Sequence, residues 1–286
     1  MRILSVLGFL ILAPFLGGLL DGIDRKISAR MQRRVGPPLL QPFYDLKKLF
    51  SKQTIAVNNV QLLLNLSYLV FLMISGALLF AGTDILMCLF ILSTADMFLI
   101  LAASSDSSPY ANMGASRELV QMMAYEPLTL LVAIGFYLTT GSFQVDQIIR
   151  QPISALLFMP GMLLGSVFSS TIKFRKSPFD LSTSHHAHQE MVKGLTTEMS
   201  GFNLAIMNIA EYYEIVLILG IFCLFIINRN PVSWIAAVIF CLFLYFIEIL
   251  VDNTCSRVKW NTVLRSCWLV TLLTGGINLF VLMLIK

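Results

Sequence analysis

The chain has 286 residues, of which 57% are hydrophobic and 13% charged, and its mean hydropathy is +0.80. Soluble domains have about 45–50% apolar and about 25% charged residues, so this composition excludes a soluble enzyme and predicts an integral membrane protein. The net charge of +4 is explained below by basic loops beside the membrane and requires no nucleic-acid partner.

Apolar segments long enough to cross a bilayer recur along the chain, since a hydrocarbon core of about 30 Å takes about 20 helical residues. Eight such segments are predicted, at residues 3–23, 62–82, 85–104, 118–140, 153–172, 203–227, 232–251 and 264–285. They are continuously apolar, whereas the strands of a membrane barrel alternate apolar and polar residues. The sequence therefore predicts an all-α membrane protein that forms a single polytopic domain over residues 1–286.

Basic residues predict how the chain is oriented. Most of the 20 lysines and arginines lie in or beside four loops, at about 24–61, 105–117, 173–202 and 252–263. Lys and Arg accumulate in cytoplasmic loops, so these loops are expected in the cytoplasm and both termini on the outer face. The prediction is a multi-pass protein of a prokaryotic plasma (inner) membrane.

The first of these loops contains a short amphipathic segment after the run "RRVGPP". Leu39, Phe43, Leu46 and Phe50 recur at spacings of three and four, as on one face of a helix. This pattern predicts a helix that lies along the membrane surface in contact with lipid. A cradle for a soluble partner is the alternative interpretation of the same pattern.

Five acidic residues fall inside or at the ends of the predicted spans, where an ionised group is costly: Asp96, Glu126, Glu211, Glu214 and Glu248. Glu126 precedes Pro127, which cannot donate to the carbonyl of Met123 and disturbs the helix there. Glu211 and Glu214 lie on one helix face. Each carboxyl by itself could be a neutral, hydrogen-bonded group. Five together predict a buried proton or ion path.

The most polar stretch is "SPFDLSTSHHAHQEMVKGLTTEMSG", residues 177–201, which holds all three histidines. Three interpretations remain open for His185, His186 and His188 with Glu190 and Glu198. Two histidines on one helix face could bind a metal ion, the segment could be a solvated or partner-packed loop, or the imidazoles could act as protonatable switches near pH 6.5. We favour the switch, because a third metal ligand is not evident.

The sequence lacks the motifs of a self-sufficient redox enzyme or pump. Its five cysteines are scattered without a C-x-x-C pair, so this chain is expected to bind no iron–sulfur cluster. Neither a phosphate-binding loop nor a dinucleotide fingerprint is present. We therefore predict a chain without a catalytic site, a cofactor or a bound metal of its own.

Five motifs in fixed order carry a family resemblance: "RVGPP", "SPYANMGASRE", "YEP", "KSPFDL" and "TTEMSG". Their order and separations resemble those of the NADH dehydrogenase subunit 1 family of respiratory complex I. The chain is more similar to the matching subunit of energy-converting (Ech-type, group 4) nickel-iron hydrogenases. The resemblance covers essentially the whole chain and implies a membrane anchor that couples electron transfer to ion movement.

The resemblance also implies roles for individual residues and for partners. The docking interface would include Arg33, Arg34, Asp106, Arg117 and Glu118, while Asp180 would belong to a coupling loop with the histidines, Glu190 and Glu198. Expected partners are the hydrogenase large and small subunits, a ferredoxin-like iron–sulfur subunit, an antiporter-like membrane subunit and lipid. The nickel-iron site and the iron–sulfur clusters would lie in those partners.

One departure from the resemblance decides which branch we favour. Where complex I has glutamates beside its quinone cavity, this chain has "STSHHAHQE". We therefore expect ferredoxin-linked hydrogen evolution coupled to H⁺ or Na⁺ translocation. A quinone-reducing subunit and the same anchor in a formate hydrogenlyase or CO-oxidising complex remain alternatives. Two rivals explain less: a stand-alone transporter lacks the expected internal symmetry, and a purely structural anchor leaves the five acids unexplained.

Overall fold

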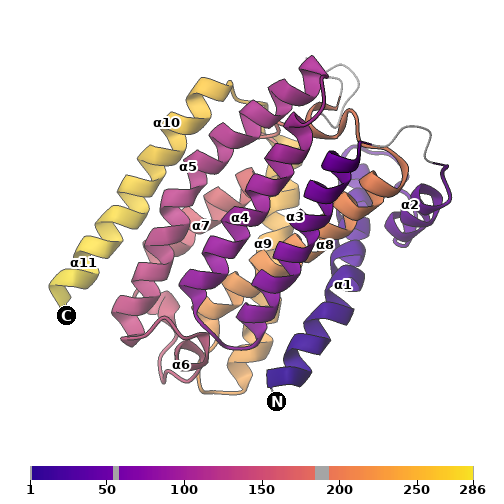
Figure 1. The fold of residues 1–286 in the computed structure, drawn as a ribbon. Helices are drawn as coiled ribbons and strands as arrows, with labels where there is room; N and C mark the ends of the chain where they lie inside the picture. The colour runs from indigo at the N-terminus through magenta and orange to yellow at the C-terminus, as the bar shows by residue number, and fades with distance from the viewer. Residues whose placement is uncertain (1, 54–57, 184–192, 286) are drawn as a thin grey trace.

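The computed structural model describes residues 2–53, 58–183 and 193–285, which form a bundle of helices (Figure 1). The helices are α1 (Arg2–Met31), α2 (Gln41–Phe50), α3 (Asn59–Phe80), α4 (Ile85–Ser104), α5 (Pro109–Thr140), α6 (Val145–Ile149), α7 (Pro160–Lys173), α8 (Gly201–Ile226), α9 (Val232–Thr254), α10 (Trp260–Val270) and α11 (Ile277–Ile285). A π-helical turn, Thr271–Gly276, joins the last two. Within the described ranges no strand forms, which agrees with the predicted all-α class.

Seven helices of the described chain are long and apolar enough to cross a membrane: α1, α3, α4, α5, α8, α9 and the continuous segment Trp260–Ile285. The predicted span at 153–172 instead consists of a 3₁₀ turn, Ala155–Leu157, followed by α7. At 14 residues α7 is about 21 Å long, less than the hydrocarbon thickness of about 30 Å. The predicted count of eight is therefore not confirmed.

Two predicted loops are shorter than expected because helices extend into them. α1 continues to Met31, so Arg25, Lys26 and Arg30 belong to a helix. α5 begins at Pro109, a residue that fits the first helical turn because it needs no backbone donor there. α5 also continues through Pro127 to Thr140.

The predicted amphipathic segment is confirmed as α2. Its Pro42 and Leu49 are buried, whereas Lys47 and Lys48 are exposed, and the helix packs against α1 and α8. In Figure 1 it lies at the margin of the bundle, beside α1. Whether lipid or a protein partner covers its outer face stays a prediction.

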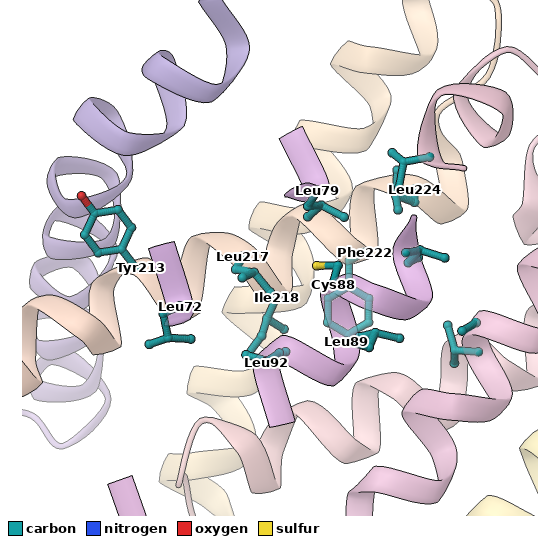
Figure 2. Close-up of a cluster of buried hydrophobic side chains, with 14 of the residues drawn as sticks. Leu72, Leu79, Cys88, Leu89, Leu92, Tyr213, Leu217, Ile218, Phe222 and Leu224 are labelled. Atoms are coloured by element: carbon teal, nitrogen blue, oxygen red, sulfur yellow. The ribbon is translucent and has the colours of Figure 1, made fainter. Parts of the chain in front are cut away.

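The bundle has two ends, which we name by what they hold. The loop end holds the α4–α5 turn, residues 174–183 and 193–200, and the α9–α10 connection, while the terminal end holds both chain termini (Figure 1). α8 lies centrally and contacts α1, α2, α3, α7 and α9. Figure 2 shows its side chains Leu217, Ile218 and Phe222 beside Leu89 and Leu92 of α4.

The contact between α1 and α8 depends on a glycine. A Cβ atom at Gly17 would overlap the backbone of Tyr212, whereas one at Gly8 would meet nothing within 4 Å. We expect Gly17→Ala to lower the melting temperature of the purified complex, because the clash outweighs the gain of up to about 1 kcal/mol that alanine brings to a helix. Gly8→Ala is the matched control and should not lower it. Equal melting temperatures for the two variants would contradict this packing.

Candidate functional site

Five buried side chains from five helices meet inside the bundle, and we call them the inner cluster: Tyr68, Asp96, Tyr125, Lys173 and Glu214. The Lys173 ammonium contacts a carboxylate oxygen of Asp96 and lies 3.3 Å from Oε1 of Glu214. The Tyr125 hydroxyl donates to Asp96 at 2.8 Å, and the Tyr68 hydroxyl donates to Glu214 at 2.9 Å. One cation is thus shared between carboxylates of α4 and α8.

Helix ends and helix faces place these groups. Lys173 is the last residue of α7, where a cation also complements the negative end of the helix dipole. Its side chain is 8% exposed, and those of Asp96 and Glu214 are 3% and 4% exposed. Two carboxylates beside one ammonium leave a negative charge uncompensated within the cluster. Such a site has a physical reason to hold an additional proton.

A second group, the outer cluster, lies toward the loop end and consists of Arg175, Glu118 and Glu211. Nε of Arg175 lies 2.9 Å from a carboxylate oxygen of Glu118 on α5, and Nη1 lies 3.3 Å from Glu211 on α8. Arg175 is buried, and its backbone adopts the left-handed conformation with a φ of 52°. Its position two residues after Lys173 links the two clusters through the chain.

A third set of charges comes from α1. Lys176 forms an ion pair with Asp24 at 2.7 Å, and its ammonium lies 4.7 Å from the ring centre of Tyr245. Arg25 pairs with Asp21 at 2.9 Å and with Asp45 of α2 at 2.8 Å. The end of α7 and the segment after it therefore place cations against acids of α1, α4, α5 and α8.

One cavity of about 1550 Å³ joins these groups. Its lining includes Lys173 and Glu214 of the inner cluster, Arg175 and Glu211 of the outer cluster, and Asp24. The lining continues to residues of the loop end, among them Arg34, Lys193 and Lys259. The side chain of Glu211 is 37% exposed, which allows its carboxylate to contact solvent in this cavity. The arrangement provides a polar route from the loop end to the buried carboxylates.

The predicted path acids do not all meet. Asp96 and Glu214 lie in the inner cluster and Glu211 in the outer one. Glu248 is buried elsewhere, on α9, where it accepts a hydrogen bond from Ser170 of α7. Glu126 is partly exposed, and among the described residues no hydrogen bond or ion pair joins its carboxylate to the other four acids. The structure therefore gives no support to Glu126 as a member of the path.

The residues expected at the docking interface lie in different environments. Arg33 and Arg34 are exposed, and Arg117 donates to the carbonyl of Leu181 at 3.4 Å. Asp106 accepts hydrogen bonds from Asn58, at 2.7 Å, and from Gln61. Glu118 is 6% exposed and is paired with Arg175. The structure thus places Glu118 inside the charged network, not on a surface that a partner could contact.

The expected coupling loop is described only in part. Asp180 is buried and accepts a hydrogen bond from Arg257 at 2.8 Å, while Glu198 is exposed. His185, His186, His188 and Glu190 lie outside the described residues. In the ranges that the structure does describe, no group of three or more His, Cys, Asp or Glu side chains could hold a metal ion. The three interpretations of the histidines remain predictions.

The cations of the network were missed in the sequence. Lys173, Arg175 and Lys176 follow an apolar segment in "IKFRKSPFD", so they resemble ordinary basic residues of a cytoplasmic loop. The available signal was the excess of acids in the spans, because buried carboxylates require nearby cations or protons. Which cations serve that purpose depends on where the chain returns after α7.

Comparison with known proteins agrees with this geometry. The sequence profile of the NADH dehydrogenase family matches residues 3–283. The chain belongs to this family. Membership confirms the expected relationship to respiratory complex I, and the all-α class and the multi-pass membrane character are supported by seven candidate spans.

Relatives of this NADH dehydrogenase family member come from different complexes. It is 31% identical over 209 residues to hydrogenase-4 component C of Escherichia coli (strain K12), covering 66% of the chain and 64% of that relative. That match spans just under two thirds of the relative's length. The corresponding NADH-quinone oxidoreductase protein of Rhodospirillum rubrum is 28% identical over 300 residues, covering 92% of this chain and 87% of the other.

The fold is also found in a solved respiratory complex. A chain of the membrane-bound sulfane sulfur reductase, an archaeal respiratory membrane complex, superposes with a TM-score of 0.88 and 21% identity. The superposition covers 98% of this chain and 99% of the other. At this identity the likeness establishes the fold of this family member and leaves its activity to be argued from its own residues.

Proposed function

We propose that this chain is a non-catalytic membrane subunit that couples electron transfer in a peripheral arm to the translocation of H⁺ or Na⁺. The observation that carries the proposal is the inner cluster, in which Lys173 is shared between Asp96 and Glu214. Ionisable groups inside a membrane protein are costly and mark ion or proton pathways. A shared ammonium allows a proton to be gained or lost with only local rearrangement.

The outer cluster and the cavity supply the connection to the loop end. Arg175 lies between Glu118 and Glu211, and the cavity passes from these groups to exposed loop residues. Unit charges about 4 Å apart interact by about 4 kcal/mol at an effective dielectric constant of about 20. A change of charge in a docked partner can therefore alter the proton affinity of Glu211 and, through Arg175, that of the inner cluster.

For the attached module we propose an energy-converting hydrogenase. The similarity to hydrogenase-4 component C supports this branch, as does the histidine-rich loop that replaces an acidic one. The partners would be the hydrogenase large and small subunits, a ferredoxin-like iron–sulfur subunit and an antiporter-like membrane subunit. These partners would carry the nickel-iron site and the iron–sulfur clusters, and the complex would lie in a prokaryotic plasma membrane.

The second candidate is a quinone-reducing complex, favoured by the match to the Rhodospirillum rubrum NADH-quinone oxidoreductase protein over 92% of this chain. The same anchor in a formate hydrogenlyase or a CO-oxidising complex is a variant of the first candidate. These candidates differ in the soluble module and share the coupling role of the membrane network.

The composition of the purified complex and its response to quinone-site inhibitors test the choice. We expect an affinity-tagged chain to co-purify with a nickel-containing large subunit, and hydrogen evolution from reduced ferredoxin to be unchanged by inhibitors at stoichiometric amounts. The tagged chain expressed alone should evolve no hydrogen and is the control. A bound quinone in the purified complex, or potent inhibition, would assign the protein to the quinone-reducing branch.

A further inference from the structure

Two cysteines that play no part in the charged network lie side by side in the apolar bundle. Sγ of Cys223 on α8 and Sγ of Cys241 on α9 are 3.2 Å apart. Sγ of Cys241 also lies 3.3 Å from the carbonyl oxygen of Leu219, one turn before Cys223 on α8. This second contact positions the Cys241 thiol against α8, so that the two sulfur atoms are held together by the packing of both helices.

The other three cysteines do not form such a pair within the described residues. Cys88 contacts Ser75, the Cys267 thiol donates to the carbonyl of Ala124, and Cys255 is exposed near the loop end. All five are free thiols. The chain therefore contains one described dithiol together with three single thiols that serve as internal controls.

We propose that Cys223 and Cys241 form an oxidisable dithiol that closes to a disulfide between α8 and α9. An S–S bond is about 2.05 Å long, so the sulfur atoms must approach each other by about 1 Å. α8 and α9 are already packed together and are joined by the short connection at 227–231. The closing step needs no change in the order or direction of the helices.

The surroundings determine which oxidant can act. Cys241 is 5% exposed and Cys223 is partly buried, so an oxidant must be small and uncharged to reach the pair. An azodicarboxamide such as diamide has these properties. Two S–H bonds break and one S–S bond forms, while the N=N bond of the oxidant becomes HN–NH by accepting both protons and both electrons. No net charge remains among the apolar side chains.

A disulfide here would join helices that carry different buried acids. α8 carries Glu211 and Glu214, and α9 carries Glu248. The bond would fix the distance between these helices toward the terminal end of the bundle. This inference concerns thiol chemistry alone and does not depend on the proposed function.

The experiment uses the intact complex in native membranes, treated with diamide and then denatured for alkylation with N-ethylmaleimide. We expect the number of alkylated thiols in this chain to fall from five to three and to return to five after dithiothreitol. Mass spectrometry should identify a linked peptide containing Cys223 and Cys241.

Single variants separate this pair from the remaining thiols. Cys223→Ser should lose no thiol on oxidation, whereas Cys88→Ser should still lose two, because its dithiol is intact. The proposal is overturned if the oxidised wild-type chain keeps five alkylatable thiols, or if Cys223→Ser also loses two. A linked peptide between other cysteines would equally refute it.

Discussion

Replacement of Glu214 by glutamine is expected to stop ion transport by the intact complex while its redox reaction continues. The Gln side chain has nearly the same size and still accepts the hydrogen bond from Tyr68, but it cannot bind or release a proton. Loss of one proton-transferring group lowers a rate by about 100-fold or more. Inside-out vesicles should evolve hydrogen from reduced ferredoxin and build almost no pH or Na⁺ gradient.

Glu126→Gln provides the matched control for this experiment. From the sequence, Glu126 was expected to act in the same path, but the structure places its carboxylate apart from the other acids. We now expect the Glu126→Gln variant to pump as the wild type does. If Glu214→Gln pumps normally in fully assembled complex, the inner cluster is not part of the path. If Glu126→Gln alone abolishes pumping, the path runs elsewhere.

The largest loss of stability is expected for Arg175→Met. This change leaves Glu118 and Glu211 without their cation, and Glu118 is only 6% exposed. Removal of one partner from a buried ion pair costs about 3–5 kcal/mol, because the remaining charge has lost its compensation. We expect a large decrease in the melting temperature of the purified complex and a reduced yield of assembled complex.

Two further variants test the physical cause. Arg150→Met removes an arginine whose side chain is 76% exposed in its ion pair with Asp146, so it should cost at most about 1 kcal/mol. The double variant Arg175→Met, Glu118→Gln should recover part of the lost stability, since the uncompensated buried carboxylate is gone. Equal destabilisation by Arg175→Met and Arg150→Met would show that the outer cluster contributes no more than a surface ion pair.

The membrane character of this protein was determined by its sequence because the relevant signal is local. Continuous apolar segments such as 62–82 and 203–227 correspond to α3 and α8, since each must bury its backbone polar groups within one helix. The spacing of Leu39, Phe43, Leu46 and Phe50 likewise predicted α2. Five motifs in fixed order were enough to place the chain in its family.

The length of the helices was less certain from sequence, because hydropathy does not mark where a helix ends. α1 extends to Met31 through charged residues that hydropathy assigned to a loop, and α5 starts at Pro109. The segment 153–172 is apolar enough for a span, yet only its second part is the helix α7. Tertiary contacts with α5, α8 and α10 accompany this shorter helix inside the bundle.

Only the tertiary structure decided which charges belong together. Asp96, Lys173 and Glu214 are far apart in sequence and meet because α4, the end of α7 and α8 pack around one point. Glu126 and Glu248 carry the same sequence signal as Glu214, but their helix faces direct them away from that point. Charge inside a span is a property of one residue, which the sequence reveals. A network is a property of side-chain direction across helices, and that depends on how the helices pack against one another.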